Sequence, residues 1–183
     1  MIDHSKIAAA EAYYEQCGYQ KIDVPWVIER EAYSATFPEH AFPFFTLGGF
    51  LPASGEQSFI QLMLEGKLPP GKYQCTTPCF RDEATYDELH LPYFYKVELI
   101  EVNRPNRYLG DVLEVAHTFL SRYCELKIVP ISTEQMDIVE LSSGIELGSY
   151  GKREFKDFSW LYGTGMAEPR LSQVLTKINS PDE

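Results

Sequence analysis

The sequence lacks any apolar run long enough to cross a membrane. No stretch of its 183 residues approaches the ~18 apolar residues that such a span requires. The first residues, Met1–Lys6, also lack the basic region and the apolar run of a signal peptide. These two absences predict a soluble, cytoplasmic chain that has no membrane partner.

Paired cysteine motifs are missing as well. The chain has four cysteines, Cys17, Cys75, Cys79 and Cys124, and no two of them form a C-x-x-C pair. Cys75 and Cys79 share one face of an expected strand, but no second pair completes a structural zinc site. Reduced and mostly buried thiols are the better interpretation, which favours an intracellular protein.

Basic runs are scarce, because the longest is Lys152-Arg153 in a chain whose formal net charge is −11. Autonomous binding of a nucleic acid needs a basic stripe that displaces counterions. The charge therefore argues against strong nucleic-acid binding by this chain alone. A local basic pocket for phosphates stays compatible with it.

The composition is that of a globular protein, with 44% hydrophobic and 14% aromatic residues. A chain of this length can bury roughly 70% of its unfolded surface in one domain. The sequence shows no internal repeat and no low-complexity segment. We therefore expect a single domain over residues 1–183.

Hydrophobic periodicity and turn residues predict how the elements follow one another. The expected helices are Ser5–Gly18, Gln57–Gly66, Leu109–Tyr123 and Pro169–Ile178. The expected strands are Tyr19–Ile28, Lys72–Asp82, Phe94–Val102, Glu125–Pro130, Asp137–Leu141 and Phe158–Tyr162. This order predicts an α+β fold in which helices flank a mostly antiparallel six-stranded sheet.

Two segments carry further signals. Pro25 lies inside the first expected strand and cannot donate to a ladder, which places that strand at an edge or an interface. The aromatic segment Glu29–Ser54 is predicted to be a long functional loop or a short hairpin with flanking loops.

The segment Phe80–Glu98 is the richest in chemistry. Its two strands would turn back on each other and present Arg81, His90 and Phe94 to one pocket. Two cationic groups and an aromatic face are what a nucleoside triphosphate needs. Glu83 shares a strand face with Arg81 and could accept from an exocyclic amine, although a plain cross-strand ion pair explains the same two residues.

The second segment is Gly163–Arg170. Glycines such as Gly163 and Gly165 permit close backbone approach, and the helix that follows offers unpaired N–H groups. Arg170 in its first turn opposes the helix dipole, which predicts an anionic or aromatic partner for this cation. A simple turn is the alternative, since Gly-x-Gly alone is a weak signal.

The third segment is Asp137–Glu146, in which three carboxylates and two hydroxyls gather near a strand end. Oxygen ligands of this kind suit Mg²⁺ and leave room for phosphate. A solvated strand face with a serine turn is the alternative.

Together these segments resemble the signature motifs of class II aminoacyl-tRNA synthetase catalytic domains, and the resemblance covers roughly Tyr13 to Leu175. FRDE…HLPYFYKVE looks like motif 2, GTGMAEPR looks like motif 3, and Tyr13–Pro25 is similar to motif 1, which builds a dimer interface. The ELSS run at Glu140–Ser143 resembles the metal-binding strand of pyrrolysyl-tRNA synthetase and of ammonia-dependent asparagine synthetase. The chain departs from the pattern at Tyr93, Ala167 and Glu168-Pro169, and its length leads us to expect no anticodon-binding domain.

The resemblance implies a role for each matching residue. In the ATP site it implies Arg81 for the α-phosphate and the substrate carboxylate, Glu83 for the adenine amino group and His90 for the β- and γ-phosphates. It implies Phe94 and Arg170 for the two faces of adenine, with Arg170 also touching the γ-phosphate, and the Gly163–Gly165 run for close approach. For Mg²⁺ it implies Glu140 and Ser143, with Asp137 and Glu146 as weaker candidates. On the substrate side it implies Gln57 and Glu98.

The activity that the resemblance implies is ATP-dependent activation of an amino acid as an adenylate, by a homodimer that uses Mg²⁺. The acceptor could be a tRNA, bound weakly or with the help of a partner, or else a carrier protein or a small amine. A non-catalytic paralogue that acts as a regulatory or accessory subunit is the second hypothesis. An unrelated α+β binding domain with accidental motif matches is the third.

Overall fold

The computed structural model describes residues 1–37, 42–82, 86–103 and 108–180. Within this part of the chain, seven strands form the main sheet in the order β1-β4-β5-β9-β8-β7-β6. These strands are β1 (Gln20–Lys21), β4 (Gly71–Phe80), β5 (Tyr93–Val102), β9 (Phe158–Glu168), β8 (Glu146–Phe155), β7 (Gln135–Glu140) and β6 (Leu126–Ser132). All neighbours pair antiparallel except β1 and β4. The predicted α+β class with a mostly antiparallel sheet is confirmed.

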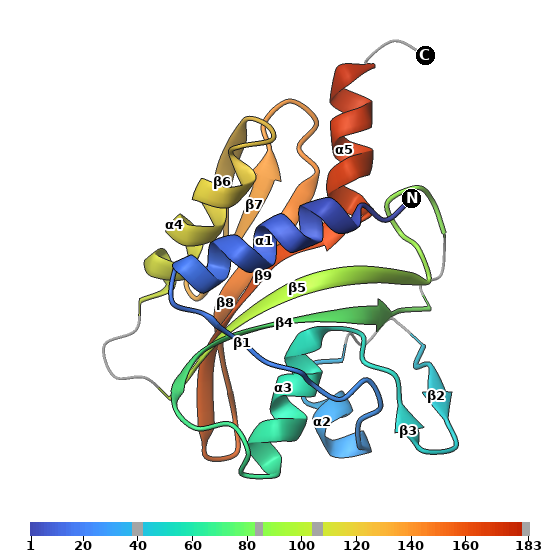
Figure 1. The fold of residues 1–183 in the computed structure, drawn as a ribbon, viewed down its shortest axis with the longest axis vertical. Helices are drawn as coiled ribbons and strands as arrows, with labels where there is room; N and C mark the ends of the chain where they lie inside the picture. Colours follow the sequence, from blue (N-terminus) through green and yellow to red (C-terminus); the bar gives the residue numbers. More distant parts are fainter. Residues whose placement is uncertain (38–41, 83–85, 104–107, 181–183) are drawn as a thin grey trace.

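Helices cover both faces of this sheet (Figure 1). One face packs against α1 (His4–Gln16), α4 (Leu109–Leu120) and α5 (Arg170–Asn179), and the other packs against α2 (Arg30–Ser34) and α3 (Gly55–Leu64). All the expected helices are present, but α2 was not expected. None of the helices in the described residues is long and apolar enough to cross a membrane.

The two sheet faces are set by the alternation of side chains along β5. Val97 and Leu99 point into the core with α1 and α4, and Ile100 and Val102 point into the core with α2 and α3. We call the second face the site face. Phe94, Lys96 and Glu98 are each an even number of residues from Ile100 along β5, so they lie on the site face too.

The prediction of six strands is wrong, because β8 was missed. The sequence of β8, ELGSYGKREF, holds two glycines and the Lys152-Arg153 pair, so it lacks a clear apolar alternation. It is a strand because β7 and β9 hydrogen bond to it from both sides. Tertiary pairing here overrides weak local propensity.

The prediction of a strand over Tyr19–Ile28 is correct only for Gln20–Lys21, which pair with β4. The ladder ends there, apart from the Ile22 N–H, which donates to the carbonyl oxygen of Gln74, and Ile28 bridges instead to Phe50. Phe50 belongs to the hairpin of β2 (Phe45–Thr46) and β3 (Gly49–Phe50). The hairpin alternative for this region is therefore confirmed.

The glycine run also differs from the expectation, since β9 continues through Gly163 and Gly165 to Glu168. A Cβ on Gly163 would come within 2.7 Å of Tyr150 and 2.9 Å of Val112, and one on Gly165 within 2.8 Å of Tyr14. These glycines therefore make room for core side chains packed between the sheet and α1 and α4.

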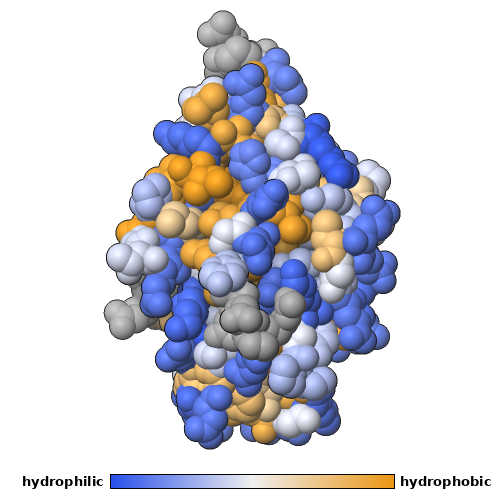
Figure 2. All heavy atoms as spheres, turned by 90° about the vertical axis from the view of Figure 1, so that its left-hand side faces the viewer, coloured by the Kyte–Doolittle hydropathy of each residue, from blue (hydrophilic) through white to orange (hydrophobic). Residues whose placement is uncertain are grey.

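The outer strand of the sheet on the other side is β6. Figure 2 shows the side of the molecule where α4 and β6 lie, with apolar surface in its upper half among hydrophilic side chains. Ile128 and Ile131 of β6 are about half exposed. Lys127 and Pro130 on the same strand are features that limit edge-to-edge pairing with other chains.

Candidate functional site

A hollow opens between the site face and the start of α5. Its empty space is about 570 Å³, part of which is open to solvent. Two sets of residues line it: Arg81, Phe94, Lys96, Glu146, Leu147, Thr164 and Ala167 from the sheet and its edge, and Leu89, His90, Leu91, Pro169, Arg170 and Gln173 from the loop before β5 and from α5. The hollow thus joins two of the three segments singled out in the sequence, together with Glu146 from the third.

Arg81 enters this hollow directly after β4. Its Nε donates to the carbonyl oxygen of Ala53 at 3.0 Å, and its guanidinium carbon lies 5.2 Å from the centre of the Phe94 ring. The hydrogen bond and the cation–π contact fix the orientation of the planar fork. Arg81 and Phe94 therefore meet, as the sequence predicts.

Arg170 enters the same hollow from the first turn of α5. One terminal nitrogen donates to the carbonyl oxygen of Leu89 at 3.4 Å, and the other lies 3.8 Å from Glu146 Oε1. Glu146 is thus an anionic partner of Arg170, as the sequence predicts for a cation at a helix N-terminus. This ion pair is half exposed and long, so it holds Arg170 only weakly.

The loop before β5 shapes the third side of the hollow. Asp87 Oδ1 accepts from the backbone N–H groups of Leu89 and His90 at 2.7 Å, and it lies 2.9 Å from His90 Nδ1. The hydrogen bond to His90 holds the pKa of Asp87 below its usual value. Asp87 therefore orients the imidazole of His90, which lines the hollow.

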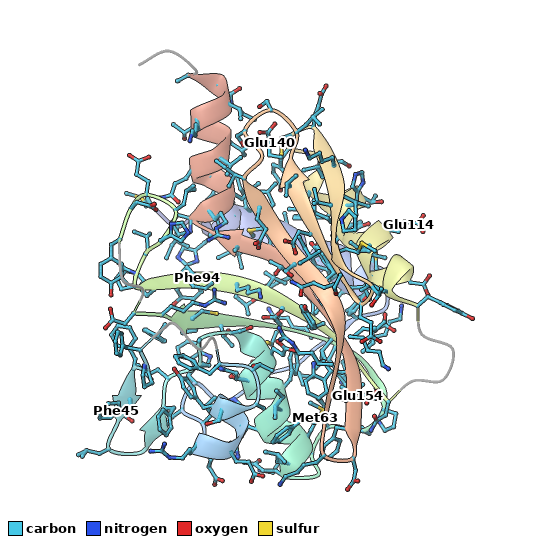
Figure 3. All side chains as sticks on the ribbon, turned by 180° about the vertical axis from the view of Figure 1, so that it is seen from behind. Phe45, Met63, Phe94, Glu114, Glu140 and Glu154 are labelled. Atoms are coloured by element: carbon cyan, nitrogen blue, oxygen red, sulfur yellow. The ribbon has the colours of Figure 1, made fainter. Side chains whose placement is uncertain are left out.

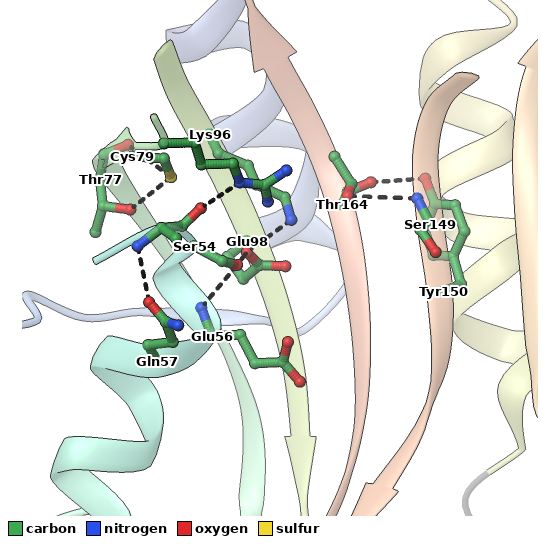
Figure 4. Close-up of polar contacts among 12 residues, drawn as sticks. Ser54, Glu56, Gln57, Thr77, Cys79, Lys96, Glu98, Ser149, Tyr150 and Thr164 are labelled. Atoms are coloured by element: carbon green, nitrogen blue, oxygen red, sulfur yellow. Dashed lines mark hydrogen bonds and ion pairs between the residues drawn. The ribbon is translucent and has the colours of Figure 1, made fainter. Parts of the chain in front are cut away.

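A buried polar cluster continues inward from the hollow along β5 (Figure 4). Glu98 is 0% exposed, and its Oε2 accepts from Ser54 Oγ at 2.6 Å and from Lys96 Nζ at 2.9 Å. Glu98 does not line the hollow itself, but it pairs with Lys96, which does. Gln57 is not, because its amide bonds the backbone of Ala53 and Tyr33.

The expected metal ligands lie apart from the hollow. Figure 3 shows Glu140 at the end of β7, well away from Phe94 on β5, and neither Glu140 nor Ser143 lines the hollow. Burial opposes ionisation of Glu140, but hydrogen bonds from Ser143 and Ser142 prevail and lower its pKa to about 2.

This donor set fits a magnesium ion only if most of its ligands come from elsewhere. An ionised carboxylate and a hydroxyl are suitable oxygen donors, and Mg²⁺ commonly takes one or two carboxylates plus phosphate and water. Among the described residues no group of three His, Cys, Asp or Glu side chains could cage a metal. Both Glu140 oxygens already accept from Ser142 and Ser143, and neither Glu140 nor Ser143 lines the hollow, so this pair does not share a site with a triphosphate bound in the hollow.

The remaining expected site residues are placed as follows. Glu83 lies outside the described residues. A Cβ on Gly163 or Gly165 would point toward core side chains rather than into the hollow. Asp137 lies on the site face, two strands away from β9.

Lys96, Ser54 and Thr164 are polar residues of this region that the sequence reasoning missed. Period-2 alternation from Phe94 could have found Lys96, because it places Phe94, Lys96 and Glu98 on one face. Ser54 and Thr164 gave no such signal, since β-sheet pairing and the docking of α3 bring them to Glu98.

Comparisons with known proteins give matches over most of the chain. The family model of the tRNA synthetases class II core domain (F) matches residues 55–182. A serine–tRNA ligase of Alcanivorax borkumensis is 32% identical over 111 residues, 52% of this chain and 26% of that protein. One of Coxiella burnetii is 26% identical over 167 residues, 82% of this chain and 38% of that protein.

Solved structures share the fold. A cytoplasmic serine–tRNA ligase of Naegleria fowleri in complex with AMP has a TM-score of 0.68 at 17% identity, covering 89% of this chain and 45% of that one. The pyrrolysyl tRNA synthetase PylSc of Desulfitobacterium hafniense has a TM-score of 0.68 at 21% identity, covering 93% and 64%. The chain thus spans less than half the length of these serine–tRNA ligases.

Proposed function

This chain belongs to the tRNA synthetase class II core domain family, and on that premise we propose that it activates an amino acid with ATP. One observation carries the proposal: Arg81 and Arg170, from segments far apart in the sequence, line a single hollow with Phe94. The hollow offers two cations for phosphates and one ring for a base. ATP and the amino acid are the proposed substrates.

In the proposed reaction a carboxylate oxygen of the amino acid attacks the α-phosphorus of ATP. A carboxyl oxygen–phosphorus bond forms, the bond to the β-phosphate oxygen breaks, and its electron pair leaves with pyrophosphate. Little proton transfer is needed, so catalysis is positioning and stabilisation of charge.

The residues of the hollow can divide this work. Arg81 offers a planar fork that can hold a phosphate and a carboxylate oxygen together, and Phe94 beneath it offers a surface for adenine. Arg170 and His90 face the space that the β- and γ-phosphates would occupy. Glu140 and Ser143 lie outside the hollow and take no part in this step, so a Mg²⁺ that neutralised phosphate charge would need other ligands there.

The acceptor of the activated amino acid belongs to the proposal only in outline. A tRNA, a carrier protein or a small amine would each suit an adenylate. With a net charge of −11, tRNA binding by this chain alone would be weak or dependent on a partner. Homodimerisation through Tyr13–Pro25 and a cytoplasmic location remain parts of the same proposal.

The direct test is ATP–pyrophosphate exchange with a panel of amino acids. We expect exchange with one amino acid or a narrow group, and none without an amino acid, because the label returns to ATP only through an adenylate. Binding of a fluorescent ATP analogue is measured in parallel. ATP binding with no exchange for any amino acid would contradict the enzyme and support the accessory-subunit alternative.

Replacing Asp87 with alanine tests whether the loop before β5 serves ATP. The variant releases His90 and the backbone of Leu89, so the loop must be ordered when ATP binds. Such ordering costs about 0.5–1.5 kcal/mol, which predicts a roughly two- to tenfold higher KM for ATP in the exchange assay. Asp157→Ala, at an exposed turn, is the control. Equal KM values in the two variants would remove His90 from the proposed site.

A further inference from the structure

A buried carboxylate lies where the N-terminal ends of α1 and α5 come side by side (Figure 1). It belongs to Glu168, the last residue of β9, which is 0% exposed. Because Ala167 lines the hollow, the alternation along the strand turns Glu168 to the opposite face of the sheet, which α1 covers. The proposed mechanism does not use this carboxylate, although it stands two residues before Arg170.

Glu168 takes part in a closed ring of hydrogen bonds. Ser172 Oγ donates to Glu168 Oε1 at 2.9 Å and accepts from Lys6 Nζ at 3.1 Å. Lys6 Nζ also donates to Asp3 Oδ2 at 2.5 Å, and the Asp3 N–H closes the ring by donating to Glu168 Oε2 at 3.4 Å. We call Asp3, Lys6, Glu168 and Ser172 the helix-start ring.

The helix-start ring attaches the first turn of α5 to a helix that already has a cap. Asp3 is the N-cap of α1, where its Oδ1 accepts from the backbone N–H groups of Ser5 and Lys6. In the described part of the chain, no side chain caps α5 in this way. The bond from Ser172 to the ring is therefore a side-chain anchor for the start of α5.

This anchor sets the direction in which Arg170 points. Successive residues of an α-helix are about 100° apart around its axis, so Ser172 and Arg170 lie on nearly opposite sides of α5. Holding Ser172 against α1 therefore turns Arg170 toward the hollow.

The other contacts of α5 do not fix this rotation as well. Arg170 makes only contacts of 3.4 and 3.8 Å in the hollow. The buried residues of the helix are Leu171 and Val174, and apolar contacts are not directional, whereas hydrogen bonds are.

We propose that Glu168 and Ser172 are positioning residues for Arg170, because the helix-start ring fixes the rotation of the first turn of α5. The proposal rests on the proposed function, in which Arg170 faces the β- and γ-phosphates of ATP. A buried carboxylate needs partners that an apolar side chain would not need. Packing against α1 alone therefore does not explain a glutamate at this position.

The test measures the affinity for a fluorescent ATP analogue. Ser172→Ala opens the ring and should weaken binding about three- to tenfold, since the side chain of Arg170 must then be ordered when ATP binds. Glu168→Gln keeps the shape but loses one acceptor and the charge, so it should show a similar loss. Ser172→Thr keeps the hydroxyl and should bind like the parent protein.

The matched control is Thr176→Ala. Thr176 lies one turn further along α5, and its hydroxyl donates to the backbone of Ser172 outside the ring. Its loss should change the affinity by less than about twofold, as expected of a site that is independent of the hollow. Circular dichroism and thermal unfolding verify that each variant is folded.

A double-mutant cycle separates positioning from a general loss of structure. Arg170→Ala should bind the analogue at least about tenfold more weakly, because it loses a charge-assisted contact with phosphate. Arg81 and Phe94 remain in this variant, so its affinity stays measurable. Adding Ser172→Ala to it should then change the affinity by less than about twofold, since the ring acts through Arg170.

The outcomes separate this proposal from the proposed function. A loss in Ser172→Ala that disappears when Arg170 is absent supports the ring, even if the chain shows no exchange. Unchanged affinity in folded Ser172→Ala and Glu168→Gln, or an equal loss with and without Arg170, overturns the ring and leaves the proposed function standing. If the parent protein binds no ATP, the proposed function fails, and the ring has no positioning role.

Discussion

Arg81→Ala is expected to lower kcat/KM in ATP–pyrophosphate exchange by about 10³-fold, the largest loss of activity that we predict. Removing one preorganised donor from a charged transition state typically costs 10²- to 10³-fold. Arg81 would act on two reacting groups, the phosphate and the carboxylate, so the upper end applies. Arg81→Lys keeps the charge but loses the bidentate fork, and its activity should lie between that of Arg81→Ala and that of the parent protein.

The chain offers a closely matched control for this variant. Arg30 is exposed, and its guanidinium lies 5.1 Å from the Phe50 ring, much as Arg81 lies over Phe94. Arg30→Ala removes a similar cation–π contact outside the hollow and should leave exchange unchanged. Thermal unfolding shows whether both variants fold. Exchange by folded Arg81→Ala within threefold of the parent protein would remove the proposed mechanism.

Trp160→Ala is expected to cause the largest loss of stability, about 3–5 kcal/mol in the free energy of unfolding. Trp160 is 0% exposed and packs with α3 on the site face. Its indole Nε1 donates to Glu56 Oε1 at 2.6 Å, and Glu56 also pairs with Arg153. The substitution therefore opens a cavity and takes a donor from a buried carboxylate. Urea unfolding measures the change.

Trp160→Phe separates these two effects. It keeps most of the ring but loses the N–H, which should cost about 1–3 kcal/mol. Burial raises the pKa of Glu56, and the bond from Trp160 opposes this. Without that bond the folded-state pKa rises further, so the loss of stability should grow as the pH rises through the raised folded-state pKa of Glu56, above its ordinary value of 4.5.

The second tryptophan is the control for these variants. Trp26 is 52% exposed, and Trp26→Ala should change the free energy of unfolding by no more than about 0.5 kcal/mol, as surface substitutions usually do. If Trp160→Ala and Trp26→Ala were equally stable, Trp160 would not hold α3 to the sheet. A pH-independent loss in Trp160→Phe would show that the bond to Glu56 is dispensable.

Local pattern was sufficient for the parts of the fold with strong periodicity. The helices α1, α3, α4 and α5 and the strands β4 and β5 follow from apolar spacing and turn residues. Phe94 and Arg81 meet because a single antiparallel pair joins them, with Cys79 opposite Phe94. A site within one hairpin can be predicted because its geometry is local.

The glycine run and β8 could not be predicted in the same way. In the sequence, Gly163 and Gly165 predict close backbone approach before a helix, yet the space where a Cβ would lie is filled by Tyr150 and Tyr14 from other elements. The residues of β8 form a strand because they have partners on both sides. In both cases long-range packing prevails over local preference.

By itself the sequence determined the α+β class, the resemblance to one family, and a cationic and aromatic hairpin around Arg81, since these depend on residues that are close in the chain. Only the tertiary structure decided that Arg170 shares a hollow with Arg81 and that Glu140 lies apart from it. Sheet order brings such residues together through hydrogen-bond register between distant segments, and no local pattern encodes that register.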